Sequence, residues 1–266
     1  MNDEKIKKEY SKKLKLFEKY NQYYYDKSKP LVSDQLFDSL KNEITQIEKK
    51  YPFLKNSKSP GENVGYKPSK IFKKVNHKSP MLSLGNAFSE DDLINFEKKI
   101  LNYLHQNKEI EYSAEPKIDG ISASLTYING VFKVGLSRGD GKEGEDITSN
   151  LKTIPDIPKI ILDKDFPEEI EIRGEVFIKN NDFKNLKDKF ANPRNAASGS
   201  LRQKNSEDTK KIPLKFIAYT YGYEKGLTIN NQKDFLKNLE KWGFKINPLN
   251  ITLTGIKKLM INYKKI

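Results

Sequence analysis

The segment EPKIDG, residues 115–120, stands between two strand-like stretches of the chain. In extended backbone Glu115 and Lys117 point to the same side, because side chains alternate along a strand. Asp119 and Gly120 then supply residues typical of a turn. A lysine held at a strand end beside other cations can lose its proton near neutral pH and act as a nucleophile. Taken alone, the segment favours an ordinary surface lysine before a turn, and a reactive lysine is the alternative that its surroundings must support.

The stretches around this segment predict a sheet. Strand-like patterns occupy residues 109–115, 121–128, 131–138, 170–178 and 212–221. The pair Asn129–Gly130 separates two of them and is a signal for a hairpin turn. Strands joined by hairpins, with helices between groups of strands, are typical of an α+β domain whose sheet is mostly antiparallel.

A small helical domain is expected in front of this sheet, over residues 1–70, with the larger domain over 71–266. The first expected helix, 4–22, repeats apolar residues at helical spacing. The second follows a cap at Ser33 or Asp34 and ends before Pro52. Its expected apolar face consists of Leu36, Phe37, Leu40, Ile44 and Ile47.

Two further helices are expected in the larger domain. Ser89, with Asp92 three residues later, is a capping signal for a helix. The apolar face of that helix is formed by Leu93, Phe96, Ile100, Leu101 and Leu104. The last stretch, Ile251–Ile266, also has a helical pattern.

Charge and composition limit the class of protein. The 266 residues include 49 Lys and Arg against 36 Asp and Glu, a net charge of +13, and the pI is about 9.4. Such a charge suits a polyanion such as DNA, although a coding bias toward Lys, Asn and Ile is the alternative. The mean hydropathy of −0.77, the polar start and the absence of cysteine predict a soluble cytoplasmic protein without a signal peptide, disulfides or a cysteine zinc site.

Arginine is rare and its positions are informative. Only four of the 49 basic residues are arginine: Arg138, Arg173, Arg194 and Arg202. A chain that otherwise uses lysine is expected to keep arginine where a planar fork of donors meets phosphates or carboxylates.

The surroundings of these arginines, together with Lys117, resemble the covalent nucleotidyltransferases, which include DNA ligases, RNA ligases and capping enzymes. Residues 117–120 match the family's K-x-D-G motif. Three more segments resemble the family's R-G-D-G-x-x-G-E-D, R-G-E-V-F and F-A-N-P-R-N-A-A-x-G-S-L-R-Q patterns: 138–146, 173–177 and 190–203. All four arginines lie within these segments.

Other features resemble the NAD-dependent DNA ligases in particular. Residues 74–84 are similar to a stretch typical of that group. The pair Tyr24-Tyr25, followed by Asp34 and Asp38, resembles the N-terminal module that recognises the nicotinamide mononucleotide half of NAD. On a helix the two aspartates share one face. The family usually has Tyr where this chain has Phe37, which keeps a ring for stacking but loses a hydroxyl.

The resemblance implies roles for individual residues. Lys117 would take AMP from NAD, pass it to the 5′-phosphate of a DNA nick, and so serve sealing in replication and repair, with Mg²⁺ present. Expected cofactor-binding residues are Tyr24, Tyr25, Asp34, Phe37, Asp38, Ser83, Leu84, Glu115, Asp119, Arg138, Glu175 and Tyr219. Within that set Glu115 is expected beside the adenine, and Arg138 with Glu175 at the ribose. Arg194 and Arg202 are expected at phosphates or the DNA backbone, since nick sealing needs little base readout.

Several alternatives stay open. Arg173 has either a structural or a ligand role, and Tyr219 either stacks on the base or belongs to the core. His77 is expected to shape the site, and His105 to be structural. The family's later D-G-V-V-x-K motif, OB-fold and zinc module are not found, so this stretch is expected to be a C-terminally incomplete, monomeric ligase part. A non-catalytic NAD- or DNA-binding remnant, or an ATP-using relative, is the competing interpretation.

Overall fold

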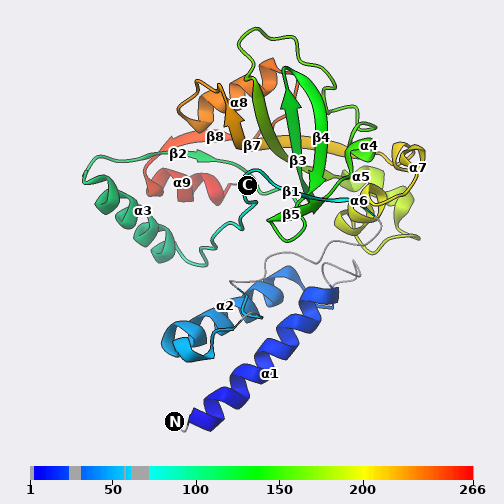
Figure 1. Ribbon diagram of the computed structural model, residues 1–266. Helices are drawn as coiled ribbons and strands as arrows, with labels where there is room; N and C mark the ends of the chain where they lie inside the picture. The colour runs from blue at the N-terminus through cyan, green and yellow to red at the C-terminus, as the bar shows by residue number, and fades with distance from the viewer. Residues whose placement is uncertain (1–2, 24–30, 57, 61–71, 266) are drawn as a thin grey trace.

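Two bodies of structure, each with its own hydrophobic core, make up the chain in the computed structural model (Figure 1). The structure describes residues 3–23, 31–56, 58–60 and 72–265. The first body consists of α1 (Asp3–Asn21), α2 (Asp34–Lys50) and the short 3-10 helix η2 (Pro52–Leu54). The expected division near residue 70 lies outside the described residues, so the domain boundary stays a prediction.

The first body is a helical hairpin held by an apolar seam. Its buried side chains are Ile6, Tyr10, Leu14, Phe17, Phe37, Leu40, Ile44 and Leu54. Both expected helices are confirmed, and Ser33 caps α2 by accepting the backbone N–H of Leu36 at 3.4 Å. The expectation that Leu36 belongs to the buried face is wrong, because its side chain is 60% exposed.

The second body is built on antiparallel strands, which confirms the expected α+β class. Its strands are β1 (Lys74–Asn76), β2 (Glu111–Ala114), β3 (Ile121–Ile128), β4 (Val131–Ser137), β5 (Glu143–Glu145), β6 (Glu169–Phe177), β7 (Lys215–Lys225) and β8 (Ile251–Thr254). Its helices are α3 (Glu90–Leu104), α4 (Thr148–Leu151), α5 (Asn180–Phe183), η3 (Lys184–Leu186), α6 (Pro193–Leu201), α7 (Ser206–Lys210), α8 (Gln232–Lys241) and α9 (Ile256–Tyr263).

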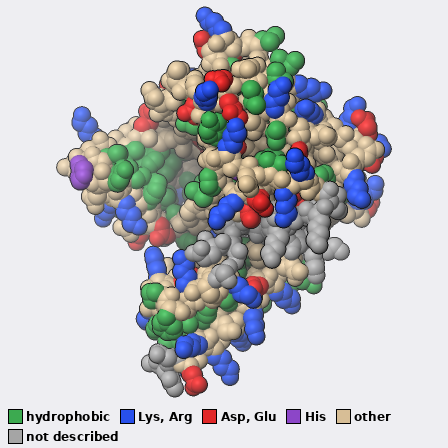
Figure 2. Space-filling view, viewed as in Figure 1, with side chains coloured by type: hydrophobic (Ala, Val, Ile, Leu, Met, Phe, Trp, Pro, Cys, Tyr) green, Lys and Arg blue, Asp and Glu red, His purple; other side chains and the backbone are tan. Residues whose placement is uncertain are grey.

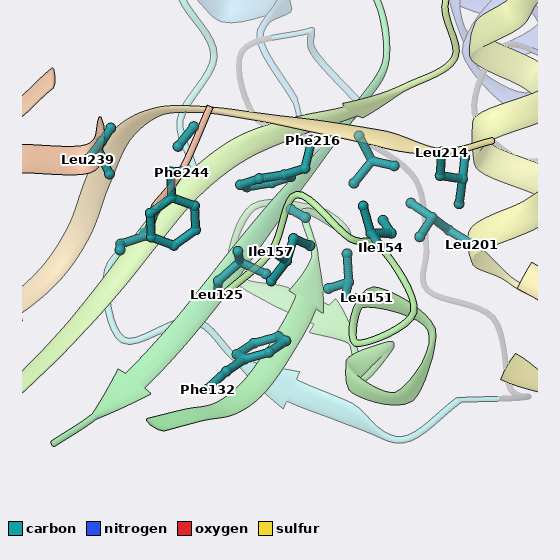
Figure 3. Packing of buried hydrophobic residues seen from close by; sticks show 14 of the residues in the cluster. Leu125, Phe132, Leu151, Ile154, Ile157, Leu201, Leu214, Phe216, Leu239 and Phe244 are labelled. Carbon is teal, nitrogen blue, oxygen red and sulfur yellow. The ribbon is translucent and has the colours of Figure 1, made fainter. Parts of the chain in front are cut away.

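The central sheet has the strand order β4-β3-β6-β7, and β1-β5 and β2-β8 form two small antiparallel ribbons. One face of the central sheet is apolar, and residues from α4, α6 and α8 join it in the main core. Figure 3 shows part of that core, with Phe216 of β7 and Leu125 of β3 among the side chains of the following loops and helices. The other face of the sheet is polar and is described below.

The hairpin between β3 and β4 follows the sequence closely. Asn129 and Gly130 both have positive φ, 48° and 74°, as a type I′ turn requires. A side chain at Gly130 would also meet the carbonyl oxygen of Ile161 at 2.2 Å. The turn sets the pairing of Ile128 with Val131 and of Tyr127 with Phe132, and the register then shifts between Thr126 and Tyr127.

Helix α3 forms as expected but does not bury its apolar face. Ser89 and Asp92 make a complete capping box at its start. No residue of α3 is buried, and Phe96 and Leu104 are 51% and 50% exposed. Figure 2 shows hydrophobic side chains gathered on this lobe of the molecule. The expected amphipathic pattern is present in α3, but none of its apolar side chains is buried in a core.

The segment 251–266 is only partly the helix that its pattern predicts. Residues Ile251–Thr254 form β8, which pairs with β2, and only Ile256–Tyr263 is helical. Isoleucine and threonine favour extended backbone, and Gly255, at φ 80°, separates the two elements. Among the helices of the described ranges, none is long and apolar enough to cross a membrane.

Candidate active site

Lys117 lies in the irregular segment between β2 and β3, and its side chain is exposed. Gly120, three residues later, is buried against β6. A Cβ atom there would lie 2.3 Å from the carbonyl oxygen of Val176 and 2.9 Å from the Cγ atom of Glu175. Glycine is thus required for the close approach that brings the lysine segment to the end of β6.

The polar face of the central sheet lies beside this segment. On β6, Glu171, Arg173 and Glu175 alternate with the core residues Ile170 and Ile172. The antiparallel register sets Glu175 opposite Ser122, Arg173 opposite Ser124 and Glu171 opposite Thr126. Hydroxyl-bearing residues of β3 therefore line the same face as the charged residues of β6.

Glu175 is buried on this face and hydrogen-bonded. Ser122 donates its hydroxyl to the Oε2 atom of Glu175 at 2.9 Å. Burial raises the pKa of Glu175 from 4.5 to about 7, while the Ser122 hydrogen bond and the nearby positive charges of Arg194 and Lys117 lower it. The influence of Lys117 on this carboxyl places the predicted nucleophile next to the polar face.

Tyr219 reaches the same face through an irregularity in β7. The β6–β7 register shifts between Arg173 and Gly174, so Tyr219 has no direct partner there. Burial raises the pKa of the Tyr219 hydroxyl to about 12, with the charge of Glu175 as a smaller cause and the Ser122 hydroxyl nearby. The tyrosine therefore belongs to the polar face and not to the main core.

Gln232 ties Tyr219 to Glu115. Its side-chain amide donates to the backbone carbonyl of Tyr219 at 2.6 Å and to the Oε1 atom of Glu115 at 2.8 Å. Ser113 also donates to Glu115. Gln232 is the first residue of α8 and was missed from the sequence, because no motif marks it. Its contact joins the segment before Lys117 to β7.

Two arginines hold the segment 79–84 over the sheet. Arg173 donates to the carbonyl oxygens of Ser79 and Pro80 and to the carboxylate of Glu171. These contacts show the structural pairing that was one of the two alternatives for Arg173, and its ligand role stays a prediction. Arg138 donates to the carbonyl oxygen of Met81 at 3.4 Å and to the hydroxyl of Ser83 at 2.9 Å.

The remaining arginines are paired with carboxylates. Arg194, near the start of α6, contacts Asp119 of the lysine motif at 3.0 Å. Arg202, at the end of α6, contacts the fully buried Glu145 at 3.2 Å. Leu84, another predicted cofactor-binding residue, has a side chain that is 76% exposed. The predicted phosphate roles of both arginines stay predictions.

In the helical body, the predicted ligand residues divide into two groups. Tyr24 and Tyr25 lie outside the described residues. Asp34 and Asp38 both belong to the first turns of α2, and Asp38 is half-buried. Phe37 is 7% exposed and stacks on Phe17 with ring centroids 5.3 Å apart. Its ring therefore packs the helical core and leaves little surface for stacking on a ligand.

The two histidines differ in their surroundings. His77 is buried, its Nε2 atom lies 3.1 Å from the carbonyl oxygen of Arg138, and burial lowers its pKa. This agrees with a role in shaping the site. His105 caps the C-terminus of α3 in the left-handed conformation, as a structural residue does. Across the residues that are described, no three His, Asp or Glu side chains gather into a metal site.

Comparison with known proteins identifies the family. The family model described as "NAD-dependent DNA ligase adenylation domain" matches residues 69–266. A second family model, "DNA ligase-like, N-terminal NAD+-binding domain", matches residues 3–65. A DNA ligase of Pelagibacter ubique is 65% identical over the whole chain, which corresponds to 40% of that protein. DNA ligases of Parvibaculum lavamentivorans and Rickettsia bellii are 45% and 44% identical over 87% and 93% of the chain, and 34% and 38% of their own lengths. The chain therefore spans well under half the length of these relatives, and it belongs to the NAD-dependent DNA ligase family.

Proposed function

We propose that this chain performs the adenylation step of NAD-dependent DNA ligation, with Lys117 as the residue that receives AMP. The observation that supports this most is the position of Lys117, which is exposed and lies three residues before Gly120, where the chain packs against Val176 and Glu175 of β6. The two family matches, which together cover nearly the whole chain, support the same reaction.

In the proposed step, the uncharged Nζ atom of Lys117 attacks the α-phosphorus of NAD. A phosphorus–nitrogen bond forms, the phosphorus–oxygen bond of the pyrophosphate breaks, and nicotinamide mononucleotide leaves with the electron pair on its phosphate oxygen. The proton of the attacking amine passes to solvent. Reactions at phosphorus depend mainly on positioning and on positive charge around the phosphate oxygens.

The residues around Lys117 suit the AMP half of NAD. Glu115, held by Ser113 and Gln232, is available to the adenine. Tyr219 offers a ring to the base, and Glu175 an acceptor to a ribose hydroxyl. Further proposed binding residues are Ser83, Leu84, Asp119 and Arg138.

The helical body is the proposed receptor for the nicotinamide half. Asp34 and Asp38 lie four residues apart on α2, a spacing that puts both positions on one face of the helix. Tyr24, Tyr25 and Phe37 complete the proposed set, although the packing of Phe37 favours an indirect contribution.

Magnesium is expected on chemical grounds, but the described side chains do not form a metal cage. Mg²⁺ is usually held by one or two carboxylates together with substrate phosphates. The residues present do not by themselves fit a protein-only magnesium site, so no step of the mechanism is derived through the metal.

The later steps, transfer of AMP to a 5′-phosphate and sealing of nicked DNA in replication and repair, are proposed for the longer proteins of the family. Arg194 and Arg202 of this chain are the proposed contacts to phosphates or the DNA backbone in those steps. A cytoplasmic, monomeric protein is the matching proposal for this chain. The alternative is a binding remnant that keeps the fold without turnover.

A labelling experiment tests the proposed step. The protein is incubated with Mg²⁺ and NAD labelled in its adenylate, and the modified peptide is identified by mass spectrometry. We expect one AMP on Lys117 and at least a hundredfold loss of label in Lys117→Ala, since the attacking atom is gone. Lys133→Ala, which removes an exposed lysine of β4, is the control and should label normally.

Two results would contradict the proposal. Label that persists in Lys117→Ala would exclude this lysine as the nucleophile. Complete absence of an adduct in the parent chain, at any NAD concentration, would favour the binding remnant.

A further inference from the structure

The hydroxyl of Ser122 hydrogen-bonds to Glu175, and the proposed reaction assigns no role to this serine. It donates to the Oε2 atom of Glu175 at 2.9 Å, across the register pair that joins β3 to β6. Ser122 therefore holds one carboxylate oxygen and leaves the Oε1 atom to a ligand.

The protonation state of Glu175 decides what that second oxygen can do. An ionised carboxylate only accepts hydrogen bonds, whereas a protonated one also donates. A ribose hydroxyl can donate to the ionised form at either oxygen. Because Glu175 is buried, its pKa is raised to about 7, and the two forms coexist near neutral pH.

The groups that face Glu175 come from every neighbouring element. Arg194 of α6 and Lys117 of the preceding segment favour the ionised carboxylate, and Asp119 opposes it. Tyr219 of β7 lies next to the pair, and Arg173 and Arg138 contribute positive charge on the same face. Ser122 donates a hydrogen bond to the carboxylate, and its hydroxyl is also a hydrogen-bond partner of Tyr219.

We propose that Ser122 is a positioning residue for Glu175: its hydroxyl fixes one carboxylate oxygen and favours the ionised form that receives a hydroxyl of the nucleotide. This inference rests on the proposed function for its ligand, but the interaction between the two residues does not. Because a hydrogen bond to a charged group favours the charged form, loss of this one should shift the ionisation of Glu175 upward by about one pH unit or more.

The chain provides a matched control two residues along β3. Ser124 points to the same face, is 1% exposed, and its hydroxyl has no hydrogen-bond partner among the described residues. Ser124→Ala removes the same atom from the same strand without removing a contact to Glu175. Ser122→Thr keeps the hydroxyl and tests whether its chemistry matters.

The direct test is a titration of Glu175 in the intact chain, followed by carbon NMR of labelled glutamate and assigned with Glu175→Gln. We expect Ser122→Ala to move the midpoint upward by about one pH unit. Ser124→Ala and Ser122→Thr should keep the parent midpoint. An unchanged midpoint in Ser122→Ala, or an equal rise in Ser124→Ala, would overturn the proposal.

The rate of AMP transfer from NAD supplies a second readout. The acid limb of its pH profile should move upward in Ser122→Ala, with the loss of rate largest below pH 7 and recovered at higher pH. A uniform loss at every pH would indicate a purely structural role and would contradict the proposal. If the parent chain takes no AMP at all, the proposed function fails while the titration still decides the role of Ser122.

Discussion

At the scale of single residues, Glu175 shows how burial and function oppose each other. Its carboxyl is 7% exposed on the polar face, and its pKa of about 7 reflects the loss of water around the charge. A carboxyl whose pKa is higher in the folded than in the unfolded protein stabilises the fold only while it is protonated. The ionised form that suits a ligand is thus the form that costs stability.

This opposition predicts the pH dependence of unfolding. The contribution of Glu175 to the free energy of unfolding should fall as the pH rises from about 4.5 to about 7, because this carboxyl binds more protons in the folded than in the unfolded protein over that window. Glu175→Gln removes the charge and should raise the free energy of unfolding at pH 8 by roughly 3 kcal/mol, with little gain at pH 4. Denaturant unfolding at both pH values measures this.

The control for that measurement is Glu111→Gln, which removes an exposed carboxyl from β2. If Glu175→Gln stabilises the protein equally at pH 4 and pH 8, or destabilises it at pH 8, the burial argument is wrong. The same variant should also weaken AMP transfer, since an amide lacks the carboxylate charge.

Sequence reasoning reached part of this arrangement. Strand alternation correctly placed Arg173 and Glu175 on one face of β6. It was unable to separate their roles, because two partners of Arg173 are the backbone carbonyls of Ser79 and Pro80, more than ninety residues earlier in the chain. Backbone acceptors leave no trace in the identity of the residues that carry them.

At the scale of elements, the junction of β3 with β6 sets the geometry of the site. The lysine motif ends at Gly120, where β6 lies so close that an added Cβ atom would be 2.3 Å from the carbonyl oxygen of Val176. The carbonyl oxygen of Val176 is a backbone atom and is unable to rotate away as a side chain does. The glycine of the motif is therefore explained by packing, independently of any ligand.

This packing predicts a strong effect of a single methyl group. Gly120→Ala should destabilise the protein by about 2 kcal/mol or more, because β3 and β6 must separate or bend. Gly85→Ala is the control, since a Cβ atom there meets nothing within 4 Å. Thermal unfolding compares the two, and an equal effect of both substitutions would contradict the steric argument.

The elements that the sequence missed include the helices α6 and α8 and the short ribbon β1–β5. The ribbon β1–β5 has only three residues in each strand, and its strands are separated by 66 residues of chain between Asn76 and Glu143. Such pairings depend on distant partners and not on local patterning. The long strands β3 and β6 were recognised, because each alternates over eight or nine residues between the core and the polar face.

At the scale of the whole molecule, two separate cores suggest two units of stability. Ile44 is fully buried in the helical body, and Leu125 is fully buried in the main core. The helices α1 and α2 of the first body had a recognisable apolar pattern, and the sequence predicted a helical region followed by a larger sheet-containing region. The exposed apolar face of α3 was not foreseen, since amphipathic spacing indicates a face but not what covers it.

Separate cores predict separate responses to core substitutions. Ile44→Ala should cost about 2–5 kcal/mol in the helical body and reduce hydrogen-exchange protection in α1 and α2 alone. Leu125→Ala should reduce protection throughout β3, β4 and β6 and leave α1 and α2 unchanged. Loss of protection across both bodies in either variant would show that the chain unfolds as one unit.

The central claim is that Lys117 takes AMP from NAD. Its most direct measurement gives the parent chain equal amounts of NAD or ATP, each labelled in the adenylate, with Mg²⁺, and quantifies AMP on the peptide that contains Lys117. The account predicts one AMP per chain from NAD and none above background from ATP. Labelling from ATP, or labelling on a different lysine, would contradict it.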